Sequence, residues 1–155
     1  MNKIEFDEIQ KEAKKVSINK FAVGVTICDE GKVLIVKRIT DDFLGGLYEI
    51  PGGKVESGET IKNAIVRETY EETGLRITNI KSYLGYFDYS SEIGKITRQF
   101  NFSVDVEGKN VKLSNEHTDY RWITKEELSR YFKEEDKVKE VLKKFWDSTP
   151  KRLKS

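Results

Sequence analysis

The chain has 155 residues, of which 37% are hydrophobic and 35% charged, enough apolar material for one folded domain with its own core. Lys and Arg number 28 against 27 Asp and Glu, and this balance gives no electrostatic reason to expect a nucleic-acid partner or a membrane surface. A single cysteine excludes an internal disulfide framework, and no stretch approaches the roughly 18 apolar residues of a membrane span.

The N-terminal segment is charged from its start and lacks the apolar core of a signal peptide, so we expect a cytoplasmic protein. Residues 4–17 predict a short helix, because Ile9, Ala13 and Val16 recur at helical spacing. This helix can pack on the domain or on a second subunit. The sequence therefore leaves both a monomer and a homodimer open.

Strand signals follow the N-terminal helix. An apolar, β-rich run over 21–28 and an alternating run over 32–38 flank turn residues, which predicts a β-hairpin. Residues 39–46 are expected to form a loop. Residues 47–50 are expected to form a short strand that ends at Pro51.

The central predicted helix starts near Thr60 and ends at Gly74, a favourable residue just beyond a helix C-terminus. Two strands are predicted after it, roughly over 80–89 and 96–106, and the second alternates clearly between apolar and polar residues. Residues 111–118 are expected to be a polar loop.

A last short strand is predicted over 120–123. Thr124 then caps a helix, with Glu127 as its reciprocal capping-box partner. The order of strands, helix, strands and helix indicates an α/β (α+β) fold with a mixed or antiparallel sheet between helices. We predict one domain over 1–155, with a core at about 19–147 and a flexible tail over 148–155.

The central helix carries three carboxylates where its apolar stripe ends. Glu68, Glu71 and Glu72 share an arc of roughly 100° on the helical wheel, in the direction that Ile61 and Ile65 take earlier. Carboxylates this close repel one another unless a positive charge lies among them, and Mg²⁺ or Mn²⁺ suits oxygen ligands best. The alternative is a solvated helix face, although acidic residues near a helix C-terminus oppose the macrodipole.

A metal held there can clamp phosphate oxygens and lower the pKa of a bound water, which suits phosphoryl or nucleotidyl transfer. The glycine pair at 52–53 allows close approach of the backbone to a ligand. Arg67 is one turn before Glu71 and can pair with that carboxylate or with Glu68.

These residues resemble a known signature, the Nudix box, in every fixed position and in both spacings. One soft departure is Thr69, where the family usually has an aliphatic residue. The flanks also resemble the family, and the resemblance spans most of 21–132. The matching positions are Gly53, Glu59, Arg67, Glu68, Glu71, Glu72, Gly74 and Leu75.

The resemblance implies an α/β/α sandwich around a mixed sheet, and a hydrolase that uses Mg²⁺ or Mn²⁺ to act on a nucleoside diphosphate linked to another moiety. It implies that Glu68, Glu71 and Glu72 bind the metal, with the backbone carbonyl of Gly53 as a further ligand. In some members the residue at Glu68 serves instead as the base for the water.

The same resemblance gives Arg67 the role of orienting Glu68. It gives Glu59 and Gly74 structural roles within the box. Glu56, in the loop before the helix, corresponds to a position that is often acidic in such proteins and can contact substrate. A solvated surface residue is an equal alternative for Glu56.

Outside the box, Glu116 lies six residues before Trp122, where some relatives place an extra carboxylate ligand or general base. A plain loop glutamate is the alternative. His117 is expected to be an exposed loop histidine, with a phosphate contact as the alternative. Arg38 and Arg98 are predicted to meet phosphates of the substrate.

The substrate is chosen outside the box. Relatives that cleave ADP-ribose often carry a proline a short way past the box, and residues 90–92 contain none. We therefore expect hydrolysis of a nucleoside triphosphate to a monophosphate and pyrophosphate. ADP-ribose, nucleotide-sugar or dinucleoside polyphosphate cleavage stays open, as does a non-catalytic nucleotide- or RNA-binding module, although such modules usually lose box carboxylates.

Overall fold

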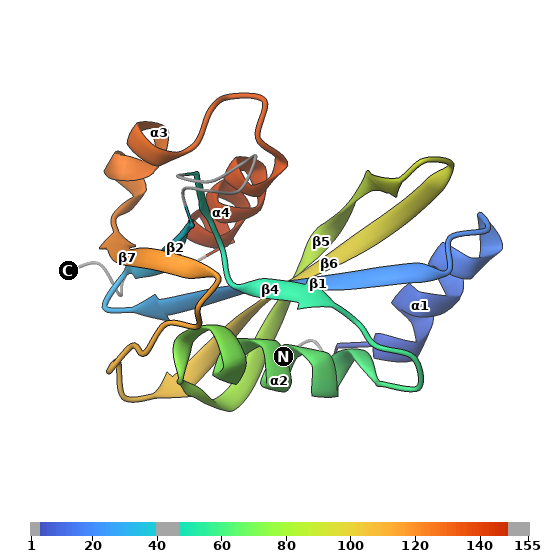
Figure 1. Ribbon diagram of the computed structural model, residues 1–155, viewed down its shortest axis with the longest axis horizontal. Coiled ribbons are helices and arrows are strands. Elements are labelled where there is room, and N and C mark those ends of the chain that lie inside the picture. The colour runs from blue at the N-terminus through green and yellow to red at the C-terminus, as the bar shows by residue number, and fades with distance from the viewer. Residues whose placement is uncertain (1–3, 40–46, 149–155) are drawn as a thin grey trace.

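A three-layer arrangement is seen in the computed structural model, which describes residues 4–39 and 47–148. Helices α1 and α2 cover one face of the sheet, and α3 and α4 cover the other (Figure 1). This confirms the α/β/α sandwich with a mixed sheet. The elements are α1 (Phe6–Lys15), β1 (Lys20–Asp29), β2 (Lys32–Arg38), β3 (Tyr48–Glu49), β4 (Gly52–Lys54), α2 (Ile61–Thr73), β5 (Arg76–Glu92), β6 (Lys95–Glu107), β7 (His117–Ile123), a 3₁₀ turn (Lys125–Glu127), α3 (Leu128–Tyr131) and α4 (Lys137–Ser148).

Strand β1 is the centre of the sheet, whose order is β3-β2-β1-β6-β5, with β4 also paired to β1 and β7 to β2. The β1–β6 pair is parallel and the other pairs are antiparallel, which makes the sheet mixed. The predicted hairpin of β1 and β2 is present, but the two strands pair only next to their turn. Beyond it they diverge, and each takes other partners.

Helix α2 confirms the helix predicted over 60–74. The Thr60 hydroxyl accepts a hydrogen bond from the Asn63 amide at 3.0 Å, and Gly74 ends the helix in the left-handed conformation. Ile61 and Ile65 are buried against the sheet, which stabilises the fold by about 1.5–3 kcal/mol for each side chain. This packing fixes the direction of the carboxylates one to two turns later.

The N-terminal helix packs on its own domain. Ala13 is fully buried, and the rings of Phe6 and Phe102 lie 5.6 Å apart. Helix α1 is shorter than the predicted 4–17, and its apolar side belongs to the same core as α2.

Two strands are longer than predicted. Strand β7 begins at His117 rather than at residue 120, because residues 117–123 pair with β2, so the end of the predicted 111–118 loop is wrong. Strand β5 extends well beyond 80–89 by absorbing several irregularities in its pairing with β6. One of these contains Gly85, at a positive φ of 89°.

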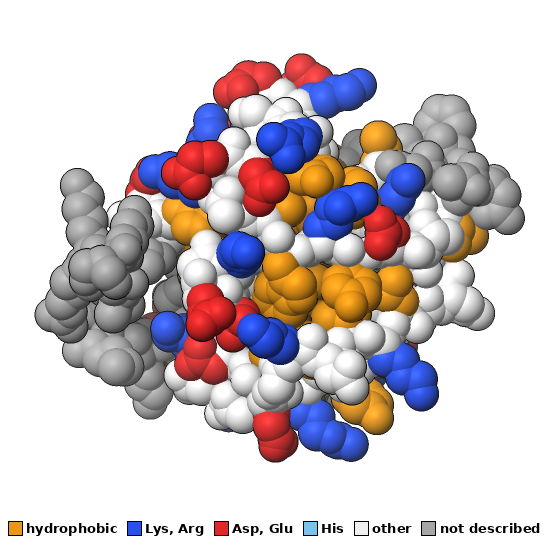
Figure 2. Space-filling model, turned by 90° about the vertical axis from the view of Figure 1, so that its left-hand side faces the viewer, with side chains coloured by type: hydrophobic (Ala, Val, Ile, Leu, Met, Phe, Trp, Pro, Cys, Tyr) orange, Lys and Arg blue, Asp and Glu red, His pale blue; other side chains and the backbone are white. Residues whose placement is uncertain are grey.

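The second core lies between the sheet and the C-terminal helices, where Leu142 and Phe145 of α4 pack with Val33 and Ile35 of β2. Within 4–39 and 47–148, no helix is long and apolar enough to cross a membrane. The face shown in Figure 2 carries Lys and Arg side chains interspersed with Asp and Glu, in agreement with the balanced charge. The predicted loop over 39–46 and tail over 148–155 fall almost wholly outside the described residues.

Candidate active site

A cavity of about 710 Å³ lies where β1 and β2 diverge, beside the C-terminal half of α2. It has an acidic wall from α2 and β4, an opposite wall from β2, β3 and the start of β7, and a floor from β1 and β6. Its lining residues are Ala22, Val23, Gly24, Arg38, Ile39, Glu49, Ile50, Gly52, Gly53, Lys54, Glu68, Glu72, Tyr89, Gln99, Asn115, Glu116 and His117.

Glu68 and Glu72 form the acidic wall and are only 9% and 7% exposed. Glu72 Oε1 accepts a hydrogen bond from the Gly52 amide at 3.0 Å. A Cβ atom on Gly53 would lie 2.5 Å from Glu68 Oε2, so only glycine lets this carboxylate rest against the backbone of β4. The glycine pair thus brings backbone and carboxylates together.

Burial raises the pKa of both carboxylates. Burial raises the pKa of Glu68, although the Arg67 guanidinium opposes the change. Burial raises the pKa of Glu72 to about 8, against the opposing hydrogen bond from Gly52. Two buried carboxylates of this kind at the edge of a cavity favour a cation between them.

Arg67 organises the acidic wall through all three of its nitrogens. Nε and Nη2 bind the two oxygens of Glu59 at 2.7 and 2.9 Å, and Nη2 also donates to the Lys54 carbonyl at 3.0 Å. Nη1 donates to Glu68 at 2.9 Å and to Glu71 at 3.1 Å. The guanidinium therefore joins the loop before α2 to the carboxylates of the helix.

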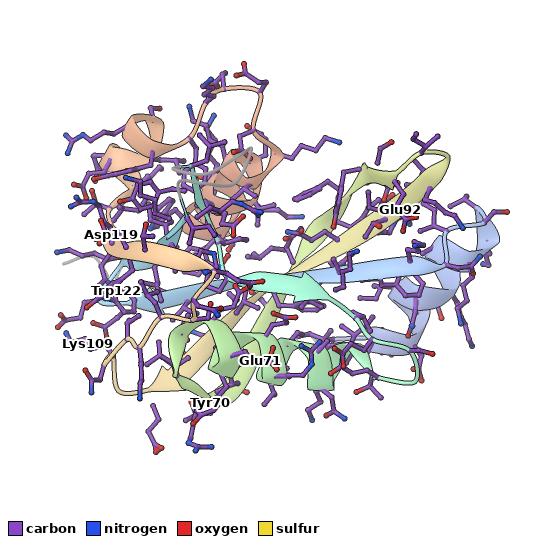
Figure 3. The ribbon with its side chains drawn as sticks, viewed as in Figure 1. Tyr70, Glu71, Glu92, Lys109, Asp119 and Trp122 are labelled. Carbon is purple, nitrogen blue, oxygen red and sulfur yellow. The ribbon has the colours of Figure 1, made fainter. Side chains whose placement is uncertain are left out.

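Glu71 does not line the cavity, although it accepts a hydrogen bond from the same Arg67 nitrogen, Nη1, as Glu68. Its side chain is 56% exposed and lies beside Tyr70 on the outside of α2 (Figure 3). Among the described residues, no three His, Cys, Asp or Glu side chains converge as a preformed metal site. Of the three carboxylates predicted to share one arc of the helix, Glu68 and Glu72 line the cavity and Glu71 does not.

The donor set nevertheless suits a hard divalent cation. Glu68 and Glu72 offer carboxylate oxygens, and Gly53 brings an oxygen-bearing backbone beside Glu68 because it has no Cβ. Oxygen donors of this kind suit Mg²⁺ or Mn²⁺. Glu71 is more exposed and is bonded to the same Arg67 nitrogen as Glu68.

The opposite wall holds an ion-paired network. Arg38 Nη1 donates to Glu49 Oε1 at 3.4 Å, and Glu49 Oε2 lies 2.8 Å from His117 Nε2. The prediction of an exposed His117 is wrong, because the residue is 6% exposed and belongs to β7. Burial lowers its pKa, but the bond to Glu49 and the nearby carboxylates outweigh burial and raise the pKa of His117 overall.

Glu116 lines the same cavity from the loop before β7, so the structure brings it to the box carboxylates as predicted for its position. Its backbone is held at both groups: the carbonyl accepts from the Ile39 amide at 3.1 Å and the amide donates to Ser114 Oγ at 3.3 Å. Its side chain is exposed and makes no hydrogen bond or ion pair with the described residues.

Two predicted substrate contacts do not line the cavity. Arg98 is 6% exposed and binds Asp88 through Nε and Nη2 at 2.8 and 3.0 Å, with its guanidinium 3.8 Å from the centre of the Tyr86 ring. Glu56 is exposed on the loop before α2, where its amide donates to Glu59. The structure thus places Arg98 in a structural ion pair and Glu56 near Arg67 on the outside.

Sequence reasoning left several cavity residues without a role. Glu49 is four residues before Gly53, the first residue of the box, and this closeness in sequence could have marked it as a site residue. Gln99 lies on the polar side of the alternating strand, which shows its face but not what that face meets. For Asn115, in a polar loop, no local pattern marks the position.

Comparison with known proteins gives independent support. A family model described as the NUDIX domain matches residues 19–145. A 66-residue segment, 43% of this chain, is 47% identical to an ADP-ribose pyrophosphatase of Methanocaldococcus jannaschii and covers only 38% of that protein. A CTP pyrophosphohydrolase of Escherichia coli is 32% identical over 111 residues, which cover 70% of this chain and 78% of the relative.

A solved structure described as a MutT protein from Methanosarcina mazei Go1 has the same fold. It superposes with a TM-score of 0.70 at 25% identity and covers 83% of this chain and 92% of its own. The family match spans both the box and the walls of the cavity. On the combined ground of the box residues, the sandwich fold and this match, the chain belongs to the NUDIX domain family.

Proposed function

We propose that the protein is a divalent-metal-dependent pyrophosphohydrolase that converts a nucleoside triphosphate into a monophosphate and pyrophosphate. The observation that carries this proposal is one cavity with two buried carboxylates, Glu68 and Glu72, on one wall and the Arg38 guanidinium on the other. Such a site can hold a metal beside the phosphate chain of a nucleotide and bind the same phosphate chain with a guanidinium.

Glu68, Glu72 and the Gly53 carbonyl would hold Mg²⁺ or Mn²⁺, with Glu71 as a further ligand after release from Arg67. When bound, the metal supplies charge neutralisation for phosphate oxygens and a more acidic water. Arg67 holds Glu68 in place through Nη1 while its other nitrogens are fixed on Glu59. The protein therefore orients a metal-binding carboxylate through a second residue that is itself fixed.

We assign the general base to Glu116. Its carboxylate is exposed at the cavity and has no hydrogen-bonding partner among the described residues, so both oxygens can accept a proton from water. Glu68 is the competing candidate, but one of its oxygens is already bonded to Arg67 at 2.9 Å. Burial raises the pKa of Glu68 overall, but the bond to Arg67 occupies one of the two oxygens that could take a proton from water, whereas both oxygens of Glu116 are available.

Hydrolysis of a nucleoside triphosphate is favoured by the relative whose alignment covers most of both chains, the CTP pyrophosphohydrolase. Cleavage of ADP-ribose is the second candidate, because a 66-residue segment is 47% identical to an ADP-ribose pyrophosphatase. A non-catalytic binding module is disfavoured by the complete set of box carboxylates, Glu68, Glu71 and Glu72.

The test is a substrate panel with Mg²⁺ and with Mn²⁺, containing the common nucleoside triphosphates, ADP-ribose, a nucleotide sugar and a dinucleoside polyphosphate. Chromatography of the nucleotides and separate detection of pyrophosphate and phosphate identify the bond that breaks. We expect nucleoside monophosphate and pyrophosphate in equal amounts. Preferred cleavage of ADP-ribose to AMP and ribose phosphate would replace this proposal with the second one.

A cytoplasmic location and a monomeric or homodimeric state stay predictions.

A further inference from the structure

Two carboxamides are hydrogen-bonded to each other on β6, and one of them, Gln99, lines the floor of the cavity. Gln99 and Asn101 project from the same face of β6, and their partners across the parallel pair with β1 are Ala22 and Gly24. A Cβ atom on Gly24 would lie 2.4 Å from both Asn101 Oδ1 and Gln99 Nε2. The small residues of β1 therefore leave the space that the two amides occupy.

Hydrogen bonds determine which way each amide faces. Asn101 is fully buried, and its Nδ2 donates to the carbonyls of Gly85 and Gln99 at 3.2 and 3.3 Å. Only an amide nitrogen can serve two carbonyl oxygens, so Oδ1 must point to Gln99, where it accepts from Nε2 at 2.9 Å. The irregularity in β5 that includes Gly85 supplies one of those carbonyls.

The orientation of Gln99 follows from this chain of bonds. One of the two N–H groups of its Nε2 donates to Asn101, and its Oε1 accepts no hydrogen bond from any residue in the described part of the chain. Gln99 lines the cavity, as does Tyr89 of β5, whose pairing partner Thr97 lies two residues before Gln99 on β6. The floor thus combines an aromatic ring with an amide of defined orientation.

We propose that Gln99 recognises the base of the substrate, and that it selects bases with an exocyclic amino group, cytosine or adenine, over their keto counterparts. This inference rests on the proposed nucleotide substrate. The free Oε1 accepts a hydrogen bond from the amino group, whereas the keto oxygen of uracil or hypoxanthine meets it acceptor to acceptor. Tyr89 supplies an apolar surface for the ring of the base.

The hydrogen bond to Asn101 makes the recognition of the base selective, because it fixes the orientation of the Gln99 amide. Cytosine and uracil have the same shape and exchange donor and acceptor at one edge, so a carboxamide free to rotate by half a turn would bind either. Rotation of Gln99 would turn Oε1 toward Asn101 Oδ1 and leave two acceptors facing each other. Asn101 is therefore a positioning residue for specificity and touches no substrate.

The experiment compares kcat/KM for CTP against UTP, and for ATP against ITP, in the wild-type protein and three variants. We expect the wild type to favour the amino base in each pair by about 10–100-fold, as for one lost or mismatched hydrogen bond in a buried site. Gln99→Met should lower kcat/KM for the amino bases to the level of the keto bases. Asn101→Ser should instead raise kcat/KM for the keto bases, because it frees Gln99 to rotate.

Gln10→Met is the matched control, since Gln10 is the other glutamine and lies on α1, away from this cavity. It should keep the wild-type ratios. Thermal unfolding verifies that each variant is folded. Equal kcat/KM within twofold for the two members of each pair in the wild type, or an unchanged ratio in Gln99→Met, would overturn the inference while leaving the pyrophosphohydrolase intact.

A binding measurement separates the inference from the proposed function. Calorimetry with CMP and UMP needs no turnover, and we expect CMP to bind more tightly than UMP in the wild type and equally in Gln99→Met. If no triphosphate is hydrolysed but this difference is present, the proposed reaction fails and the base-recognition site stands. If CMP and UMP bind alike, the site assignment fails whatever the activity.

Discussion

Two arginines of this protein make the same ion pair in different places. Arg67 grips both oxygens of Glu59 through Nε and Nη2, and Arg98 grips both oxygens of Asp88 in the same way. The third nitrogen of Arg67 reaches Glu68 at the cavity, whereas the guanidinium of Arg98 lies over the ring of Tyr86. The same pairing chemistry is therefore found at the acidic wall of the cavity in one region and within the sheet in the other.

The two regions differ in whether carboxylate oxygens beside the arginine remain available to a ligand. Around Arg67, the carboxylates of α2 are buried beside open space and keep oxygens that a metal can use. Around Arg98, the charge is paired with Asp88, and neither of these two residues lines the 710 Å³ cavity. The four predictions below test whether activity depends on the first region and only stability on the second.

The largest effect is expected from Glu72→Gln. The substitution removes the carboxylate proposed to bind the metal, so kcat/KM should fall about 1,000-fold and the affinity for Mg²⁺ should also fall. The glutamine can still accept from the Gly52 amide, and it replaces a carboxyl group whose charged form burial disfavours, so the melting temperature without metal should not drop. Steady-state kinetics, calorimetry with Mg²⁺ and thermal unfolding measure these three quantities. Unchanged turnover would refute the metal assignment.

Glu116→Gln should reduce kcat about 100-fold and leave KM within a few-fold, because a general base acts only in the transition state. Folding should be unaffected, since the side chain is exposed and makes no hydrogen bond within the described residues. The measurement is a full kinetic curve with the preferred nucleotide. A rise in KM with kcat preserved would show instead that Glu116 contributes to binding.

Arg67→Lys tests the positioning of Glu68. An ammonium group cannot reproduce bonds to Glu59, Glu68 and the Lys54 carbonyl at once, so activity should fall about 10–100-fold and the melting temperature should decrease. Arg130→Lys is the matched control, because Arg130 is exposed and has a single contact of 3.5 Å with Glu127. That control should retain both activity and stability.

Arg98→Met should have the smallest effect on activity. Asp88 loses its partner and the fold should be destabilised by about 1–3 kcal/mol, seen as a lower midpoint of urea unfolding. Below that midpoint kcat/KM should match the wild type. A large loss of activity in a folded Arg98→Met protein would instead support the sequence-based expectation that this arginine meets phosphate, and would remove the contrast with Arg67.

Local patterns in the sequence were sufficient for the elements that contain their own signals. Helix α2 could be predicted between Thr60 and Gly74 because its cap, its apolar spacing and its terminating glycine lie within one short segment. The capping box of Thr124 and Glu127 is a second case, with the Thr124 amide 2.9 Å from Glu127 Oε1. The box residues indicated the family for the same reason, because they lie in one continuous segment of the sequence.

Only the tertiary structure decided which side chains face the cavity. His117 became buried because its pairing with β2 brings it to Glu49, 68 residues earlier in the chain. Glu71 does not line the cavity, although the same Arg67 nitrogen binds it and Glu68. The direction of the Gln99 amide depends on a carbonyl in β5 and on the absence of a side chain at Gly24, in another strand. The sequence by itself thus determined the family signature, whose residues are neighbours along one helix and its loop, whereas the rest of the cavity comes from strands that meet only when the sheet forms.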